Sequence, residues 1–320
     1  MSLLSVRDVT VRYGTGRRAI AAVDNISLDL PAGGVVGLVG ESGSGKSTLA
    51  KAIVGLAELS GGAITLDGEA ISGPSRDARQ RRRRIQMVFQ DPHSSLDPRM
   101  TIGDSMAEAL TAGRRLDRQQ RRLETNRLLE LVSLEPAVTG ALPRQLSGGQ
   151  LQRVSIARAL AAEPLVLIAD EVTSSLDVSV QGSILNVLRE IRAALGFTML
   201  FISHNVAVVR YLSDTIAVMY LGQIVEVGAT DELIANPQHP YTKVLLDAVP
   251  GTVTGPDEGN RPIDGEPPDP HLPPAGCRFH PRCPVGPSAD SSRIMCTTDD
   301  PCVGAATRRH RAACHFVGDR

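Results

Sequence analysis

The sequence lacks tryptophan, and aromatic residues make up only 3% of its 320 residues. Aromatic side chains form the stacking platforms of carbohydrate and single-strand nucleic-acid sites, so both functions are disfavoured. The net charge of -1 provides no overall attraction to DNA or to an anionic membrane. No apolar run approaches the roughly 18 residues needed to cross a bilayer, and MSLLSVRDVT lacks the apolar core of a signal peptide. We therefore expect a cytosolic protein.

Cysteine is absent from residues 1–276, and all five cysteines follow, with the spacing C-x5-C-x12-C-x5-C-x11-C. The cytosol is reducing, which makes disulfides a poor explanation. Four thiolates suit a tetrahedral zinc ion or an iron–sulfur cluster. Zinc sites usually show short C-x₂₋₄-C pairs, which are absent here, so the spacing favours a [4Fe–4S] cluster. Zinc and a tail without metal both remain open.

The rest of the chain has the hydrophobic pattern of an α/β fold. Residues 4–13 alternate as a half-buried strand, and residues 35–39, 165–170 and 198–203 are short apolar runs typical of buried parallel strands. Residues 46–56 predict a helix with Leu49, Ile53 and Leu56 on one face. Residues 61–71 and 214–228 predict hairpins, and residues 104–145 predict helices.

The clearest motif is GESGSGKST at residues 40–48, which fits G-x-x-x-x-G-K-[ST] between a predicted strand and a predicted helix. Its glycines let backbone N–H groups approach phosphate oxygens, and the helix N-terminus adds positive potential. Lys46 is expected to reach the β- and γ-phosphates and Ser47 to bind Mg²⁺. The motif therefore predicts a nucleoside triphosphate site.

Two further polar sequences follow apolar strands. LIADE places Asp170 to hold Mg²⁺ through water and Glu171 to orient or deprotonate an attacking water. FISHN places His204 just beyond another strand, at the sheet edge where α/β proteins bind ligands. Taken singly, the acidic residues could cap a helix and the histidine could be structural. Together with the glycine-rich loop, they favour a nucleotide site.

LSGGQLQR, at residues 146–153, is a second glycine-rich turn that opens a helix. It predicts a second anion-binding helix end that has no lysine or Mg²⁺ ligand of its own.

These motifs together resemble the ATPase subunit of an ABC transporter over residues 3–250. They occur in that family's order. Residues 40–47 resemble Walker A, Gln90 in VFQDP resembles the Q-loop and residues 146–150 resemble the signature. Asp170 and Glu171 resemble the end of Walker B, residues 174–177 resemble the D-loop and His204 resembles the switch histidine. The resemblance implies a P-loop NTPase core with a parallel sheet, an N-terminal antiparallel β subdomain, an inserted α-helical subdomain and a small Cys-rich C-terminal extension.

The resemblance also implies roles for single residues. Glu171, His204 and Gln90 are implied to be catalytic, and Ser47, Gln90 and Asp170 to hold Mg²⁺. The implied ATP contacts are Tyr13, which resembles the adenine-stacking aromatic, Gly40, Ser42, Gly43, Gly45, Lys46, Ser47 and Thr48 from Walker A, Ser147, Gly148, Gly149 and Gln150 from the signature, and Asp177. Two such subunits face head to tail, which explains why one chain carries two phosphate-binding loops but only one lysine.

VFQDPHSSLDPRMTIGD, NPQHPYTKVLLDAVP and the cysteine-bearing tail resemble the oligopeptide/dipeptide (and nickel) importer group, and RVSIARAL resembles its second, F-type, ATPase subunit. This likeness implies a peripheral subunit at the cytoplasmic face of the inner membrane. Its implied partners are a second ABC ATPase, as a heterodimer or a homodimer, two transmembrane permease subunits and, indirectly, an extracytoplasmic solute-binding protein. The family tail places cluster ligands at Cys277, Cys283, Cys296 and Cys314 and leaves Cys302 over.

Three positions depart from the family pattern: Val172 replaces the usual Pro, Ser175 the usual Ala and Asn205 the usual Asp. None removes a group that touches phosphate, so hydrolysis is still expected. We expect an ATPase domain over residues 1–250, with its helical subdomain at about 91–151, a Pro/Gly-rich linker over 251–276 and the Cys-rich extension over 277–320.

Two other functions compete with the importer. ABC-type ATPases that act on nucleic acid or ribosomes usually carry a long coiled coil or two ATPase domains, and residues 91–145 are too few for such a coil. A regulatory ATP-binding module without turnover is disfavoured because Glu171 and His204 are both present. The basic run at residues 79–84 is interpreted as a solvated loop or helix start rather than a nucleic-acid site.

Overall fold

The computed structural model describes residues 2–14, 16, 19–112, 115–174, 176–247, 268–269, 271–301 and 310–317. The chain divides into two compact units. We call them the helical unit, made of Met1–Leu4, Leu30–Val35 and Thr65–Phe201, and the P-loop unit, made of Ser5–Asp29, Val36–Ile64 and Ile202–Arg320. Within the described residues, no helix is both long and apolar enough to cross a membrane.

The N-terminal sheet forms as the alternating pattern predicts. Strand β1 (Ser2–Tyr13) lies between β2 (Ile20–Pro31) and β4 (Gly61–Leu66), and alternate residues such as Val9 and Val11 are buried. β4 turns at Asp67 and Gly68, both with positive φ, into an antiparallel pairing with β5 (Glu69–Ala70). The predicted N-terminal sheet and its hairpin are therefore confirmed.

The central sheet of the P-loop unit has the order β11-β10-β9-β3. β3 (Val35–Val39) runs parallel to β9 (Thr215–Tyr220), whereas β10 (Gln223–Ala229) is antiparallel to both β9 and β11 (Arg311–Ala312). The prediction of a parallel sheet is therefore wrong for this part of the fold. The sheet is mixed because the hairpin at Leu221 and Gly222 reverses the chain and the C-terminal tail adds an edge strand.

The described helices of the P-loop unit are α1 (Lys46–Val54), α8 (Val206–Leu212), α9 (Thr230–Ala235) and α10 (Pro240–Asp247). The expected apolar face of α1 is confirmed for Leu49 and Ile53, which are fully buried, and is wrong for Leu56, which is 65% exposed. The helix ends before Leu56 because Gly55 adopts φ 79°, a left-handed C-cap.

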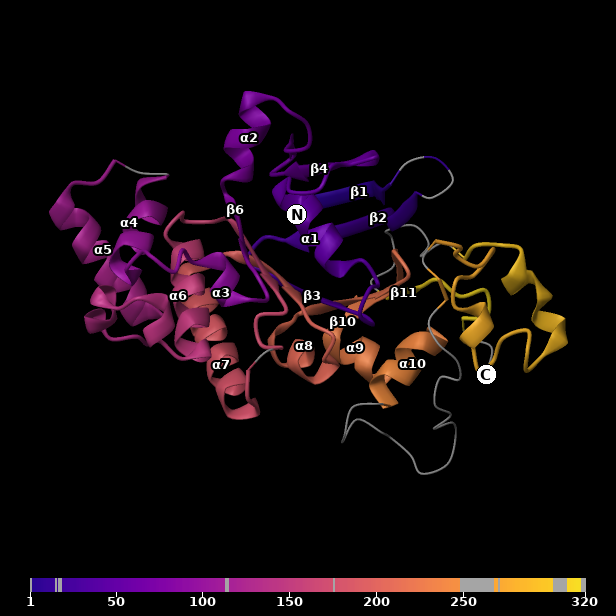
Figure 1. The fold of residues 1–320 in the computed structure, drawn as a ribbon. Coiled ribbons are helices and arrows are strands. Elements are labelled where there is room, and N and C mark those ends of the chain that lie inside the picture. The colour runs from indigo at the N-terminus through magenta and orange to yellow at the C-terminus, as the bar shows by residue number, and fades with distance from the viewer. Residues whose placement is uncertain are drawn as a thin grey trace. The chain divides into compact units, whose positions relative to one another are not determined.

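The helical unit contains β6 (Ile85–Val88), β7 (Val166–Asp170) and β8 (Thr198–Ile202) in the order β8-β7-β6, with β6 parallel to β7. Its helices are α2 (Arg76–Arg82), α3 (Pro92–Ser95), α4 (Ile102–Thr111), α5 (Arg118–Leu131), α6 (Gly148–Leu160) and α7 (Val178–Leu195), with short 3₁₀ turns η2 (Pro136–Gly140) and η3 (Pro143–Gln145). Helices α3, α4 and α5 all contact α6 (Figure 1). The basic run at residues 79–84 falls in the last turn of α2 and just beyond it, rather than at a helix start.

The predicted C-terminal extension, residues 277–320, belongs to the P-loop unit, where it packs against other elements and supplies β11. Its described residues include the 3₁₀ turns η4 (His280–Arg282) and η5 (Ser291–Thr297). Phe279 is 1% exposed, and its ring centroid lies 5.3 Å from that of Tyr220 and 5.4 Å from that of Tyr241. Most of the predicted linker lies outside the described residues.

Candidate functional site

The loop at residues 40–48 connects β3 to α1 in a conformation that requires glycine. A Cβ on Gly45 would lie 2.1 Å from the Ala22 carbonyl oxygen, and φ at Gly45 is 103°. A Cβ on Gly40 would lie 2.1 Å from the Met219 carbonyl oxygen. The loop tip, Ser42 and Gly43, is exposed. Glycine therefore lets the loop pack tightly on neighbouring backbone while its tip faces outward.

Lys46 points back into this loop from the first residue of α1. The side chain is 4% exposed, and its Nζ donates to the carbonyl oxygens of Gly40 at 2.9 Å and Glu41 at 2.7 Å. Nζ also lies 3.3 Å from Ser44 Oγ. The buried cation is thereby held at the centre of the loop, where a phosphate would bind.

Glu41, a variable position of the motif, receives contacts that the sequence did not reveal. Its backbone N–H donates to Tyr241 Oη at 2.9 Å, and its carboxylate accepts from Arg282 Nη1 at 3.0 and 3.3 Å. Arg282 also lies 3.3 Å from the Tyr220 hydroxyl and is only 8% exposed. Arg282 is adjacent to Cys283, so the C-terminal extension contacts the phosphate loop directly.

His204 belongs to the P-loop unit, comes two residues after the end of β8 and is exposed. The preceding residue, Ser203, donates its N–H to the carbonyl of Leu38 in β3 at 3.2 Å, so His204 follows the edge from which the phosphate loop also leaves. Asn205 caps α8 by accepting from the N–H of Ala207 at 3.0 Å. An Asn is as good a cap as an Asp, so this departure preserves the local fold. Tyr13, at the end of β1 in the same unit, is 46% exposed.

The helical unit carries the acidic residues. Asp170 ends β7 and is 5% exposed, and Glu171 follows at φ 48°, a left-handed conformation that is uncommon outside glycine. Gln90 Nε2 donates to Ser174 Oγ at 3.3 Å, and Ser174 Oγ donates to the Glu171 carbonyl at 2.9 Å. Gln90 and Glu171 are thus joined through one hydroxyl, and the strain at Glu171 is typical of a functional site.

The second glycine-rich turn forms the N-terminus of α6. Ser147 Oγ accepts from the Gln150 N–H at 3.3 Å and the Ser147 N–H donates to Gln150 Oε1 at 2.9 Å, a capping box. A Cβ on Gly149 would lie 2.6 Å from Val180 Cγ1 of α7, and one on Gly148 would lie 3.5 Å from Leu176. Asp177 is the exposed N-cap of α7, and Ser175 lies outside the described residues.

Comparison with known proteins decides the family. A family model described as ABC transporter matches residues 23–174, and one described as oligopeptide/dipeptide transporter, C-terminal region, matches residues 225–288. The chain is 41% identical to the di/tripeptide transport ATP-binding protein DppF of Pseudomonas aeruginosa, over 99% of this chain and 98% of that protein. The chain belongs to the ABC transporter ATP-binding family.

Two other similar proteins support the same family assignment. The oligopeptide transport ATP-binding protein OppF of Salmonella typhimurium is 45% identical over 86% of this ABC subunit and 84% of its own length. The dimeric ATP-binding cassette MJ0796, solved with ADP and phosphate, is 30% identical with a TM-score of 0.65, covering 71% of this chain and 98% of that one. ATP-binding subunits of ABC transporters are ATPases, and nothing in these likenesses supports action on nucleic acid.

The four described cysteines of this ABC subunit line one small cavity. Cys277, Cys283, Cys296 and Cys314 surround a volume of about 20 Å³, and all four are free thiols. Burial raises the pKa of Cys277 to about 12 and that of Cys283 to about 11. Among the residues that the structure describes, no group of three or more His, Cys, Asp or Glu converges to hold a metal ion. Cys302 lies outside the described residues.

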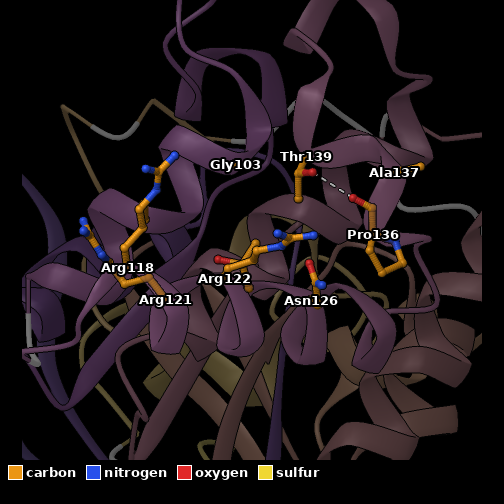
Figure 2. Close-up of a pocket in the computed structure, with 10 residues that line it drawn as sticks. Gly103, Arg118, Arg121, Arg122, Asn126, Pro136, Ala137 and Thr139 are labelled. Carbon is orange, nitrogen blue, oxygen red and sulfur yellow. Dashed lines mark hydrogen bonds between the residues drawn. The ribbon is translucent and has the colours of Figure 1, made fainter.

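Two larger cavities flank α4 in the helical unit. One of about 740 Å³ is lined by the end of β6, α4 and α6, including Met87, Phe89, Ser95, Glu108, Ala112 and Arg158. The other, of about 620 Å³, lies among α4, α5 and η2 and is shown in Figure 2. The sequence predicted neither cavity, because the residues that line each one come from several elements.

Proposed function

We propose that this chain is the ATP-hydrolysing subunit that powers import of peptides or a related small solute. The observation that carries the proposal is the full-length likeness, at 41% identity, to a subunit named for di/tripeptide transport. The match of residues 225–288 to the oligopeptide/dipeptide transporter region supports it, because that region lies outside the shared ATPase motifs.

The phosphate loop would bind the triphosphate of ATP through its N–H groups and Lys46. Ser47, Gln90 and Asp170 supply oxygen ligands, which Mg²⁺ prefers. When bound, Mg²⁺ neutralises charge on the β- and γ-phosphates. Glu171 would accept a proton from the water that attacks the γ-phosphorus, so that ADP leaves with the bridging oxygen and phosphate is released. His204 would donate a hydrogen bond to the γ-phosphate.

The experiment that tests this assignment is Glu171→Gln in the presence of the proper partner subunits. Loss of general-base help should lower ATP turnover about 10²–10⁴-fold while ATP still binds. Glu190→Gln, an exposed carboxylate on α7, is the matched control and should turn over normally. Normal turnover in Glu171→Gln would remove Glu171 from the role.

We also propose that each ATP lies between the phosphate loop of one subunit and the signature, Ser147 to Gln150, of a facing subunit. This arrangement would use both phosphate-binding helix ends of the chain. The likeness to a cassette solved as a dimer supports it. The importer group implies that the facing subunit is a homologous ATPase rather than a second copy.

The cavity of about 740 Å³ is our candidate for the permease contact, which would hold the subunit at the cytoplasmic face of the membrane. Arg158 shapes its wall, because Nη1 donates to the Ser95 carbonyl at 2.6 Å and Nη2 to Glu108 Oε2 at 3.3 Å. The cavity also borders the end of β6, which leads to Gln90. Ala112→Trp should abolish copurification with the permeases without weakening ATP binding, whereas Gln119→Trp on the exposed side of α5 should not.

For the extension, we propose that Cys277, Cys283, Cys296 and Cys314 hold a [4Fe–4S] cluster. Four cysteines line one cavity, and cysteine thiolates are the usual ligands of such clusters, so the thiols would lose their protons on binding. As described, the four side chains do not converge on one metal position. Because the cavity is small, the cysteine segments would have to move apart on loading. The role would be structural: a loaded extension would hold Arg282 against Glu41 and so brace the phosphate loop.

A further inference from the structure

The cavity of about 620 Å³ contains none of the residues assigned above to ATP, the cysteines or the permease. Helix α5 supplies half of its lining, and those residues follow the spacing i, i+3, i+4, i+7 and i+8 that places side chains on one helix face: Arg118, Arg121, Arg122, Thr125 and Asn126. Small residues complete the lining: Gly103 and Ala107 from α4, and Pro136, Ala137 and Thr139 from η2.

This face of α5 is basic where a packed helix is normally apolar. Figure 2 shows the side chains of Arg118, Arg121 and Arg122 along α5 together with Asn126. Within the described part of the chain, no carboxylate forms an ion pair with any of these three arginines. Arg127 on the same helix differs, because it pairs with Glu124 at 2.7 Å. The cavity is therefore lined by three positively charged side chains that form no ion pair among the described residues.

The position of these arginines on α5 is itself unfavourable. They occupy the first two turns of the helix, where the positive end of the helix dipole repels cations. The first turn contains no acidic residue, and the carboxylate of the N-cap, Asp117, accepts from the Gln120 N–H at 2.8 Å at the helix terminus itself. A bound anion would favourably contact the arginines.

A second observation concerns polar groups without partners. Thr125 is 5% exposed and lines the cavity, yet its side chain makes no hydrogen bond to any other described group. The Asn126 amide likewise has no partner among the described residues. Thr139, in contrast, is satisfied, because Oγ1 donates to the Pro136 carbonyl at 2.8 Å (Figure 2). A hydroxyl that lines a cavity without a protein partner is available to hydrogen-bond to a ligand there.

We propose that this cavity binds a small ligand that carries an anionic phosphate group. The planar guanidinium fork matches phosphate oxygens in a bidentate way, and three arginines line this cavity. The volume lies in the range of small-molecule sites, about 300–1,000 Å³. The small residues of α4 and η2 leave room for the remainder of the ligand. A free phosphate compound and a phospholipid headgroup share this chemistry.

The first test is calorimetric titration of the full chain with inorganic pyrophosphate, with saturating Mg²⁺ and ADP throughout so that the phosphate loop is filled. The wild type should bind one equivalent, with affinity that falls as salt rises. Arg121→Gln with Arg122→Gln should weaken binding at least about tenfold, since each removes a charged hydrogen bond. Arg127→Gln, on the same helix but paired with Glu124, should match the wild type. Unchanged ADP affinity in the double variant would show that it is folded.

The second test uses sedimentation with phosphatidylcholine vesicles, with and without phosphatidylglycerol. Vesicle binding that requires phosphatidylglycerol and is lost in the double variant assigns the cavity to a lipid headgroup, whereas pyrophosphate binding with the same pattern assigns it to a free phosphate compound. Absence of both kinds of binding in the wild type overturns the proposal. Equal binding by the wild type and the double variant also overturns it.

Discussion

Loss of the contact between Arg282 and Glu41 should lower both the stability of the folded protein and its affinity for nucleotide. Arg282→Gln removes two hydrogen bonds to the Glu41 carboxylate, at 3.0 and 3.3 Å, and one to the Tyr220 hydroxyl. The side chain of Arg282 is 8% exposed and that of Glu41 is 26% exposed. The pair thus lies between an exposed ion pair, worth about 0–1 kcal/mol, and a buried one, whose disruption costs about 3–5 kcal/mol.

We therefore expect Arg282→Gln to destabilise the folded protein by about 1–3 kcal/mol, visible as a thermal midpoint lower by a few degrees. Part of this energy holds the phosphate loop, because the Glu41 carbonyl is also the 2.7 Å acceptor of Lys46. Nucleotide affinity, measured by titration of ADP with Mg²⁺, should fall about three- to thirtyfold, which corresponds to about 0.7–2 kcal/mol. Glu41→Gln should lower stability and ADP affinity in the same way, and the double variant should show a coupling free energy of about 1 kcal/mol between the two side chains.

The control is Arg293→Gln in the same extension. Arg293 lies 3.4 Å from Asp290 and stacks on Phe316 at 4.5 Å, and the structure records no contact between it and the phosphate loop. Its loss should lower the thermal midpoint without changing ADP affinity. If Arg282→Gln and Arg293→Gln both leave ADP affinity unchanged, the extension only packs against the ATPase core and the brace does not exist.

Two further predictions use paired variants. Gly149→Ala places a Cβ 2.6 Å from Val180 Cγ1 and should destabilise the folded protein by about 1–2 kcal/mol through the α6–α7 contact. Gly182→Ala in α7 meets nothing within 4 Å and should stabilise the folded protein by about 0.5–1 kcal/mol. Both effects are measured as shifts of the thermal midpoint. Cys283→Ser should abolish iron content and visible absorbance in anaerobically prepared protein, and Cys302→Ser should retain both. Equal iron in the two cysteine variants would contradict the ligand assignment.

The sequence predicted the elements that depend on local patterns. The buried run of β3, the hairpin turns at Gly68 and Gly222, and the helix after the phosphate loop were all visible as apolar periodicity and turn residues. The prediction that Leu56 lies on the buried face of this helix was wrong, because periodicity alone did not show that Gly55 would end the helix. Helix boundaries depend on single capping residues, which periodicity does not weigh.

Contacts between distant segments could not be predicted in this way. Nothing in the sequence around Glu41 indicates that Arg282 would reach it, since 241 residues separate them. The same holds for β11, which pairs with β10 as an antiparallel edge strand, and for the arginine face of α5, which becomes a cavity only when η2 folds against it. Such features depend on tertiary packing, which a local pattern does not encode.

The central claim is that one chain supplies half of each of two ATP sites and that a facing subunit completes them. The most direct measurement is the ATP turnover rate per subunit as the purified chain is titrated with its partner ATPase. The account predicts almost no turnover by the chain alone and a rate that rises to saturation at one partner per chain. Full turnover by the isolated chain, independent of its concentration and of the partner, would contradict it.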